Sequence, residues 1–433
     1  MQVVIVGGGI GGLTAALTLH QIGISCKVYE SVRELKPLGV GINLQPYSVR
    51  ELFQLGLEDQ LREAGIPAKG LAYHTKRGQH VLTEKLGSEA GFDWPQFHMH
   101  RGALQMMLAK EVERRMGPGV LNLGHRFAEV EQSGERIKAK FVDRATGQTL
   151  EPVNADLLIG CDGVHSAVRH QFYPNEKAPH WNRVIMWRGV TEGVKLLDGQ
   201  TMVFAGTFRQ KFVAYQILKP KQERKPGEDG LMLNWLCELI APEDAEFPSE
   251  DWNRQGRMED FAPEFDDWIF PWVNIPDIVK RNAGIWEYPQ VDRDPTPQWV
   301  FDRVALLGDA AHPLTPLGSN GASLAIFDAR VLGRELAARP SDPKTALKAY
   351  EAERKPALEK ILAGNRAGGP EHFMPLVEER APNGFDDIRS VLSEEEMQIA
   401  TNYRAITGLT KDMINDCRSL IPPEQFINGP RAS

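Results

Sequence analysis

A run of glycines near the N-terminus limits the folds open to this chain more than any other feature. Residues 2–6 are mostly β-branched, residues 7–12 read Gly-Gly-Gly-Ile-Gly-Gly, and residues 13–21 have the apolar content of a helix. A strand, a glycine turn and a helix in this order predict the first unit of a doubly wound α/β sheet. The helix N-terminus then offers amides and a positive dipole to an anion. The segment therefore predicts a bound pyrophosphate.

Each glycine in this segment has a separate predicted role. Gly7 permits the tight turn, Gly9 lets a phosphate approach the backbone, and Gly12 lets the helix pack closely against the strand. Residues 25–29 predict the second strand, which ends at Glu30. A carboxylate there accepts hydrogen bonds from an adenosine ribose and repels a 2′-phosphate. NADP is therefore not expected in this loop, and a glycine turn without a ligand is the competing interpretation.

Two further motifs extend the predicted ligand beyond one nucleotide. Cys161-Asp162-Gly163 is the first, and the second is Gly308-Asp309, which follows a strand predicted at 304–307. Asp309 can hold ribityl hydroxyls at the carboxyl end of that strand. The Pro- and Gly-rich residues 313–321 then lead into a helix, whose amides would stabilise the negative charge of a reduced flavin. Together the motifs indicate FAD, and an ordinary helix cap is the competing interpretation for Asn320 taken alone.

Composition restricts the partners and the setting. A chain of 433 residues predicts two domains with a possible third element. A net charge of −8 and a pI near 5.8 argue against nucleic acid and anionic membranes as partners. The apolar stretch 3–24 contains six glycines and has no basic start, so it is not expected to be a signal or membrane segment. Four scattered cysteines predict a reducing, cytoplasmic setting.

These motifs resemble the single-component FAD-dependent aromatic hydroxylases, which have the para-hydroxybenzoate hydroxylase fold. The resemblance includes the glycine loop with Glu30, residues 161–169 and 308–313, and Tyr350, Arg354 and Pro356 in a C-terminal helix. It covers about residues 1–366. Within the family, the chain is most similar to phenazine-modifying monooxygenases of the kind that acts in pyocyanin synthesis. That closer likeness lies in four segments, residues 37–43, 100–102, 186–191 and 291–295.

The resemblance adds further cofactor residues. It implies that Arg101 contacts the flavin, that Asp162 lies where FAD and the incoming nicotinamide are handled, and that residues 39–43 border the isoalloxazine. The predicted FAD ligands are Gly7, Gly9, Ile10, Gly11, Gly12, Glu30, Gly41, Ile42, Arg101, Asp162, Gly308, Asp309, Pro316, Gly318, Asn320 and Gly321. No second glycine fingerprint is present, so NADH or NADPH would bind only transiently.

The predicted fold is a Rossmann-type FAD-binding domain with an inserted, mostly-β substrate domain and a C-terminal helical tail. The FAD-binding domain comprises residues 1–70, 98–178 and 287–366, the substrate domain 71–97 and 179–286, and the tail 367–433. Residues 184–191, 212–218 and 231–239 predict strands of the substrate domain, and 219–230 an exposed hairpin loop. The tail contains an amphipathic helical pattern over 386–420. It either wraps the FAD-binding domain or meets another subunit, for example in a homodimer.

Seven of the nine tryptophans fall between 181 and 286, which predicts an aromatic pocket or an aromatic core. The pocket candidates are Trp187, Arg188, Tyr215, Trp235 and Pro313, with Arg188 able to pair with a substrate carboxylate. A structural role in the sheet is an equal alternative for each. His98 and His100 alternate as strand residues do, so we predict no metal site. His312 is expected to hold its loop rather than to act as a base.

The resemblance implies a flavoprotein monooxygenase that consumes NAD(P)H and O2. It would hydroxylate an aromatic or N-heteroaromatic substrate, expected to be a carboxylate, through a flavin C4a-hydroperoxide. The flavin performs the chemistry, so no catalytic side chain is assigned. The alternatives are oxidative decarboxylation or Baeyer–Villiger insertion from the same intermediate, a reductase or dehydrogenase that does not use oxygen, and a binding protein without activity.

Overall fold

A six-stranded sheet forms the centre of one half of the protein. The computed structural model describes residues 1–225, 227–247, 254–398, 403 and 410–428. The strands of the sheet are β1 (Gln2–Val6), β2 (Ser25–Glu30), β8 (Leu121–Leu123), β12 (Leu157–Gly160), β20 (Val300–Phe301) and β21 (Val304–Leu306). Their order is β20-β21-β12-β1-β2-β8. Every neighbouring pair is parallel except β20 and β21, which is the arrangement of a doubly wound sheet.

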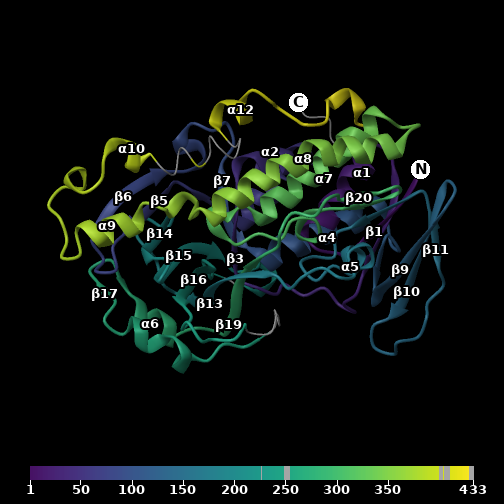
Figure 1. The fold of residues 1–433 in the computed structure, drawn as a ribbon. Helices are drawn as coiled ribbons and strands as arrows, with labels where there is room; N and C mark the ends of the chain where they lie inside the picture. The colour runs from purple at the N-terminus through teal and green to yellow at the C-terminus, as the bar shows by residue number, and fades with distance from the viewer. Residues whose placement is uncertain (226, 248–253, 399–402, 404–409, 429–433) are drawn as a thin grey trace.

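Helices pack around this sheet and place two helix N-termini at its edge. They are α1 (Ile10–Gln21), α2 (Pro46–Gln54), α3 (Glu58–Ala64), α4 (Arg101–Met116), α5 (Ala167–Phe172), α7 (Gly321–Ala338) and α8 (Pro343–Arg366). α1 contacts β1, α4 and α7, and α7 runs side by side with α8 (Figure 1). α1 follows β1 and α7 follows β21 in the chain. Both helices therefore start beyond the carboxyl ends of parallel strands, where doubly wound sheets bind ligands.

A seven-stranded sheet forms the other half of the protein. Its strands are β5 (Gly70–His74), β6 (His80–Lys85), β13 (His180–Glu192), β14 (Thr201–Thr207), β15 (Gln210–Leu218), β16 (Leu231–Ile240) and β19 (Ile285–Asp292). Their order is β19-β13-β16-β15-β14-β5-β6, and only β14 and β5 are parallel. The expected mostly-β insertion in an α/β fold is confirmed. β19 crosses the boundary expected at 286/287, and the domain limits stay predictions.

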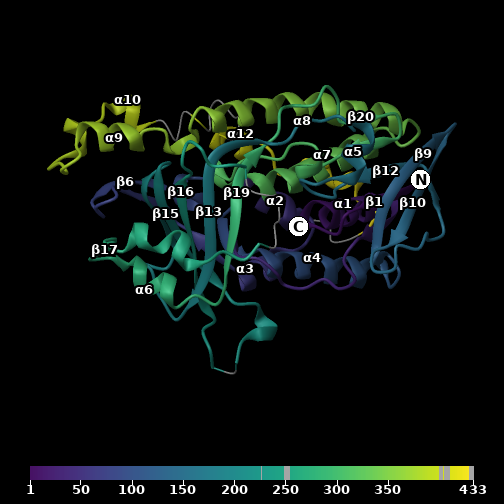
Figure 2. The ribbon, with the colours of Figure 1, turned by 60° about the horizontal axis from the view of Figure 1, so that its bottom comes forward.

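Smaller elements complete the fold. A sheet of β3 (Gly41–Leu44), β7 (Gln96–His100) and β4 (Gly65–Ala68) contacts both β15 and α7, and so links the two halves. A peripheral sheet contains β9 (His125–Ser133), β10 (Arg136–Asp143) and β11 (Val153–Ala155). It lies at the opposite end of the molecule from β17 (Ile269–Phe270), β18 (Val273–Asn274) and α6 (Ile275–Lys280), as Figure 2 shows.

Short 3-10 helices occur in the connections between these elements. They are η1 (Gly87–Ala90), η2 (Lys221–Glu223), η3 (Met258–Asp260), η4 (Ala262–Phe265), η5 (Gly308–Ala310), η6 (Leu317–Ser319), η7 (Gly369–Glu371), η8 (Ile388–Ser390) and η9 (Pro423–Gln425). η2 lies in the expected loop between β15 and β16. Four of the others, η1, η5, η6 and η7, bring residues to the cavity described below.

The C-terminal region is helical, as expected, and packs on its own chain. Its described helices are the short α9 (Met374–Arg380), α10 (Glu394–Met397) and α12 (Lys411–Asn415), while 399–402 and 404–409 of the predicted pattern lie outside the described residues. Phe373 and Val377 join a buried cluster with Tyr73 of β5. Arg50 of α2 donates hydrogen bonds to the carbonyl oxygens of Ile414, at 2.9 Å, and Cys417, at 2.8 Å. The tail thus contacts both halves of the molecule.

Within the part of the chain that the structure describes, no helix combines the length and the apolar character needed to cross a bilayer.

The tail packing predicts a loss of stability on truncating Ile421, which is fully buried in the main core. Ile421→Ala should lower the free energy of unfolding by about 2–5 kcal/mol, because it leaves a cavity. Ile427→Ala is the matched control, since that side chain is 73% exposed, and should change stability by about 0.5 kcal/mol or less. Denaturant unfolding followed by circular dichroism measures both. Equal effects of the two substitutions would contradict a tail anchored through Ile421.

Candidate functional site

The glycine loop between β1 and α1 leaves room for a ligand at one position and for nothing at two others. Gly7 has φ +108°, and a Cβ there would lie 2.3 Å from the carbonyl oxygen of Cys161. A Cβ at Gly12 would lie 2.0 Å from the carbonyl oxygen of Gly7. A Cβ at Gly9 would meet no described atom within 4 Å. Gly7 and Gly12 are therefore required by close backbone packing, whereas Gly9 faces open space suited to a phosphate.

Glu30 lies at the end of β2 and holds the glycine loop. Its Oε2 accepts a hydrogen bond from the Gly8 amide at 2.7 Å, and its Oε1 accepts one from the Val32 amide at 2.8 Å. No described side chain caps α1, whose N-cap residue is Gly9. The first amides of α1 are consequently available to an anion, while the Glu30 carboxylate keeps spare acceptor capacity beside them.

A cavity of about 610 Å³ extends from the glycine loop to the seven-stranded sheet. Most of the predicted FAD ligands line it, namely Gly9, Ile10, Gly11, Gly41, Ile42, Arg101, Gly308, Asp309, Pro316, Gly318, Asn320 and Gly321. They come from four separate parts of the chain, which the carboxyl ends of β1 and β21, the strand β3 and the start of α4 bring together.

Asp309 and Arg101 are a pair of opposite charges that face this cavity. Asp309 lies in η5 just after β21, and Arg101 is the first residue of α4. Both side chains are accessible from the cavity but are largely desolvated by the surrounding protein. Burial raises the pKa of Asp309, with His312 and Arg101 opposing the shift, and burial lowers the pKa of Arg101. A polar ligand with hydroxyl and anionic groups would relieve both desolvation costs.

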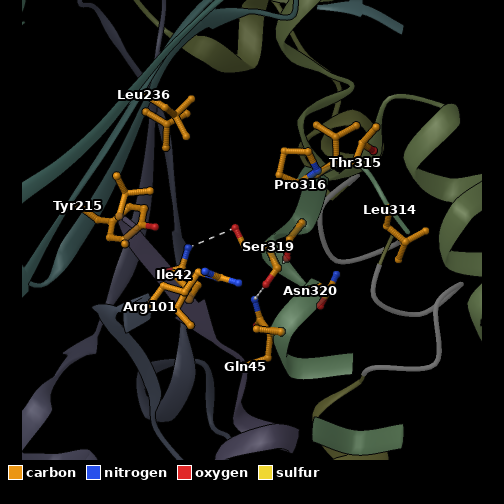
Figure 3. Close-up of a pocket in the computed structure, with 18 of the residues that line it drawn as sticks. Ile42, Gln45, Arg101, Tyr215, Leu236, Leu314, Thr315, Pro316, Ser319 and Asn320 are labelled. Atoms are coloured by element: carbon orange, nitrogen blue, oxygen red, sulfur yellow. Dashed lines mark hydrogen bonds between the residues drawn. The ribbon is translucent and has the colours of Figure 1, made fainter. Parts of the chain in front are cut away.

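The loop that precedes α7 presents backbone amides to the same cavity. The Asn320 side chain does not cap α7, because its Oδ1 instead accepts a hydrogen bond from the Tyr47 hydroxyl at 3.2 Å. The loop is fixed from β3 and α2, since Asn43 Nδ2 donates to Ser319 Oγ at 3.2 Å and Gln45 Nε2 to the Gly318 carbonyl at 3.3 Å (Figure 3). The N-terminus of α7 is thus held open towards a ligand with negative charge.

Four of the predicted FAD ligands are absent from the described cavity lining. Gly7, Gly12 and Glu30 lie directly behind the loop, where they shape it. Asp162 points away from the cavity, because its Oδ1 accepts a 2.5 Å hydrogen bond from Ser166 Oγ and its Oδ2 accepts one from the Val168 amide at 3.1 Å. Its neighbours Cys161 and Gly163 do line the cavity. The Asp162 carboxylate therefore bonds to its own loop rather than lining the cavity.

Asp328 is a supporting residue that the sequence analysis did not single out. This fully buried residue of α7 lies 2.5 Å from His312 Nε2, and its other oxygen accepts a 2.7 Å hydrogen bond from Arg354 Nε. Its Oδ2 also accepts a hydrogen bond from the Gly308 amide at 3.3 Å. Asp328 thereby fixes both ends of the loop that carries Asp309, and His312 has the loop-holding position expected for it. The sequence signal that could have identified Asp328 is an acidic residue within the otherwise apolar pattern of a helix.

The other wall of the cavity is one face of the seven-stranded sheet. Arg188 and Tyr215 line it, together with Pro313 from the opposite side. The remaining wall is mainly apolar, with Met186, Met202, Phe204, Val213, Leu236 and Tyr288. Figure 3 shows Tyr215 and Leu236 on the sheet, facing Pro316 and Asn320 across the cavity. The sheet thus supplies a largely apolar surface directly opposite the loop that the cofactor is expected to contact.

Two of the predicted pocket residues do not reach this cavity. Trp187 and Trp235 are buried on the opposite face of the sheet, in the cluster that includes Phe261. Trp187 Nε1 donates to Glu287 Oε2 and Trp235 Nε1 to Thr191 Oγ1, each at 3.1 Å. Successive strand residues point to opposite faces, so Arg188 in the cavity places Trp187 outside it. Trp187 and Trp235 are therefore not pocket residues, and of the two alternatives the aromatic core applies to them, while Trp252 lies outside the described residues.

Arg188 joins the flavin-side loop to the sheet. Its Nη2 donates a 2.7 Å hydrogen bond to the Gly41 carbonyl, and the guanidinium lies beside the Tyr215 hydroxyl. Burial raises the pKa of Tyr215 to about 12, which Arg188 partly opposes. The Arg188 Nε is buried without a partner among the described residues. One donor of this cation is thus directed into a desolvated region where an acceptor would be favourable.

The two strand histidines also have ordinary structural positions. His98 is fully buried with its ring centroid 4.8 Å from that of Tyr215, and His100 Nδ1 accepts a hydrogen bond from the Ala103 amide at the start of α4. Burial lowers the pKa of His98 to about 3 and that of His100 to about 4. Both rings are therefore neutral at physiological pH, and neither belongs to the cavity lining among the described residues.

The open space at Gly9 predicts that a side chain there separates folding from cofactor binding. Gly9→Val should leave the melting temperature of the apoprotein unchanged and weaken FAD binding about tenfold or more, a loss of about 1.4 kcal/mol or more. Gly12→Val should lower the melting temperature as well, because its Cβ collides with the Gly7 carbonyl. Thermal unfolding and FAD titration by fluorescence quenching measure the two effects. Normal FAD affinity of Gly9→Val would contradict a phosphate at this position.

The donor and acceptor set fits an extended flavin dinucleotide. The two open helix N-termini suit a pyrophosphate and an anionic ring edge, and the desolvated Asp309 carboxylate suits hydroxyl donors. The carboxylate of Glu30 beside the loop suits a ribose. These groups line, or lie directly behind, one continuous cavity, which is what a ligand that spans the whole sheet edge requires.

Comparisons with known proteins agree with this geometry. A family model described as "FAD binding domain" matches residues 1–191 and 286–365. The chain is 41% identical over 369 residues to the phenazine 1,6-dicarboxylic acid hydroxylase PhzS of Lysobacter antibioticus, covering 84% of this chain and 89% of that protein. It is 28% identical over 417 residues to the 3-amino-4-hydroxybenzoate 2-monooxygenase of Streptomyces cremeus, covering 94% and 96% of the two chains.

A solved structure shares the fold. It is Klebsiella pneumoniae HpxO complexed with FAD and uric acid, which aligns with a TM-score of 0.70 at 23% identity over 96% of both chains. The family model covers more than half of this chain, and the first relative is well above 30% identical over most of its length. The chain therefore belongs to the FAD-binding-domain family as a flavoprotein monooxygenase, and its cofactor is FAD.

Proposed function

We propose that this monooxygenase hydroxylates an aromatic or N-heteroaromatic carboxylate, with NAD(P)H as electron donor and O2 as the source of oxygen. The observation that carries the proposal is the continuity of the cavity, which joins the residues suited to FAD to a largely apolar sheet face. A planar apolar ring fits such a face. The guanidinium of Arg188 beside that face suits a carboxylate on the ring.

The relatives support this class of substrate. The names of two of them contain phenazine 1,6-dicarboxylic acid and 3-amino-4-hydroxybenzoate, and both compounds are aromatic carboxylates. The relative that matches with 41% identity is the phenazine enzyme, and phenazine is a fused aromatic ring system.

The residues around the cavity would hold FAD along its length. Gly9 and the start of α1 would receive the pyrophosphate, Glu30 the adenosine ribose, Asp309 the ribityl chain, and the α7 N-terminus the ring edge that gains charge. When bound, FAD supplies the redox chemistry that takes electrons from the nicotinamide and activates oxygen. The described side chains are then needed for positioning and for keeping the reaction dry.

Several cavity residues are suited to orienting the substrate and excluding water. Arg188 can hold a carboxylate, while Met186 and Leu236 cover the ring with apolar surface. Tyr215 and Tyr288 both have a pKa raised mainly by burial, so their hydroxyls stay protonated and can donate hydrogen bonds. A dry cavity favours transfer of oxygen to the substrate over its loss as hydrogen peroxide.

The setting and assembly expected from sequence also remain part of this proposal. All four cysteines are free thiols, which supports a reducing, cytoplasmic environment. Homodimer formation stays a prediction. So do the domain limits, since the only structural support for them is the division of strands between the two large sheets.

The function is tested by screening aromatic and heteroaromatic acids for faster NAD(P)H oxidation by the holoenzyme. A true substrate should give a product that carries one atom from ¹⁸O2, with little hydrogen peroxide. Product formed under anaerobic conditions would favour a reductase or dehydrogenase instead. Loss of carbon dioxide or ring insertion would identify the alternative oxygenase reactions, and a colourless protein that does not bind FAD would contradict the whole assignment.

Arg188 provides a sharper prediction about the carboxylate. Arg188→Met should raise KM for a carboxylate substrate about 10–100-fold, corresponding to about 1.5–3 kcal/mol for a charged hydrogen bond, with a smaller effect on kcat. The matching carboxamide should show little change.

Trp187→Phe is the control, because Trp187 lies on the opposite sheet face, and this substitution should leave both KM values within about twofold. The flavin absorbance spectrum verifies cofactor binding, since Arg188 also holds Gly41. Equal losses for acid and amide would refute the carboxylate role.

A further inference from the structure

A buried group of three charges lies at one end of the cavity. Lys211 of β15 is 2.6 Å from Glu238 Oε2 of the adjacent strand β16 and 2.8 Å from Glu371 Oε1 of η7. All three residues line the cavity. The side chains of Lys211 and Glu238 are 4% and 3% exposed, and that of Glu371 is 16% exposed. We call this group the acidic cluster, because it contains two carboxylates and one cation.

The C-terminal region brings Glu371 to this position. Phe373 and Met374, which follow it, are buried against Phe204 and Val213 of the substrate sheet. The ring centroids of Phe373 and Tyr73 are 4.9 Å apart. η7 also contacts α8 and η6, the 3-10 helix of the loop before α7. Glu371 is therefore fixed between the substrate sheet and the cofactor loop by packing on both sides.

The acidic cluster lies away from the end of the cavity where Arg188 holds the Gly41 loop. Along β15, Lys211 and Tyr215 are four residues apart, and Asn234, which lies opposite Tyr215, accepts a hydrogen bond from the Gly41 amide at 2.7 Å. Four strand residues span about 13 Å, so the cluster and the Gly41 loop are separated by about that distance. Arg188 lies opposite Leu236 of β16, which is two residues closer to Glu238 than Asn234 is. An aromatic acid held by Arg188 would extend towards the cluster.

Lys211 is not available as an anchor for a substrate carboxylate. Burial opposes its charge, but the carboxylates of Glu238 and Glu371 raise its pKa, so it stays protonated and engaged with both. Burial raises the pKa of Glu371, and the nearby Glu238 adds to that shift. With both acids ionised the cluster has one negative charge in excess. Carboxylates accept several hydrogen bonds each, so the cluster retains acceptor capacity towards the cavity.

We propose that Glu371 and Glu238 form an acidic subsite that binds a nitrogen-borne hydrogen-bond donor of the substrate, such as an arylamine, a ring N–H or a protonated ring nitrogen. The inference rests on the proposed function, because it takes the cavity to hold an aromatic acid. It adds a specificity determinant at the end of the ring opposite the carboxylate. Lys211 acts there as a positioning residue that keeps the two carboxylates together.

The test compares two aromatic acids that differ only in an amino group. 4-Aminobenzoate, whose amino group is opposite the carboxylate, and benzoate are titrated into the holoenzyme, and Kd is read from the change in flavin absorbance. The wild type should bind the amino compound about tenfold or more tightly, as a hydrogen bond to a charged group predicts. Glu371→Gln should reduce that preference to about threefold or less. Glu378→Gln is the matched control, because Glu378 lies on neighbouring α9 and pairs with Lys76 at the surface.

The outcomes separate this inference from the proposed function. Equal binding of the two acids by the wild type overturns the acidic subsite, whether or not Glu371→Gln folds. A preference that survives in Glu371→Gln, with a normal flavin spectrum, also overturns it. Absence of any spectral change with either acid overturns the aromatic cavity and the subsite together. A preference lost only in Glu371→Gln supports the subsite, even if the oxygenation assay fails and the proposed function is abandoned.

Discussion

Close backbone contact at the carboxyl edge of the parallel sheet determines most of this site. β1, β12 and β21 are neighbours, and each is followed by one of the three motifs at the cavity. At their junction a Cβ on Gly7 would approach the Cys161 carbonyl to 2.3 Å. The loops after β1 and β12 must therefore pack backbone against backbone. That packing directs the start of α1 into the cavity, while Asp328 of α7 fixes the loop after β21.

The second wall of the cavity depends on a different constraint, the alternation of side chains along strands. One face of β13, β15 and β16 supplies Met186, Arg188, Val213, Tyr215 and Leu236, and the opposite face forms a separate aromatic core with α6. The hydrogen bonds from Trp187 and Trp235 to polar partners satisfy their indole N–H groups inside that core. The sheet therefore separates stability from recognition, since its large aromatic residues stabilise one face and its cavity face remains free to fit a ligand.

This division explains what could be predicted from the sequence. The glycine loop, Asp309 and the α7 N-terminus were predictable because each is a local strand–turn–helix signal whose place in a doubly wound fold is fixed. The face on which a tryptophan lies was not predictable, because it depends on strand register and on which side of the sheet the cofactor half packs. Asp162 shows the same limit, since its motif was recognised while its inward hydrogen bonds are a matter of tertiary geometry.

Glu371 was beyond prediction for a further reason, because the turn that carries it has no motif and reaches the cavity only through the packing of Phe373 and Met374. Its presence there is not explained by stability. A desolvated charge cluster contributes little to folding compared with apolar residues of the same size. The rest of the described cavity wall shows that such apolar residues are accommodated, as with Val213 and Leu236. The three charges of the acidic cluster are desolvated, lie within reach of a ligand and keep acceptor capacity. Binding of a ligand in the cavity therefore explains them better than stability does.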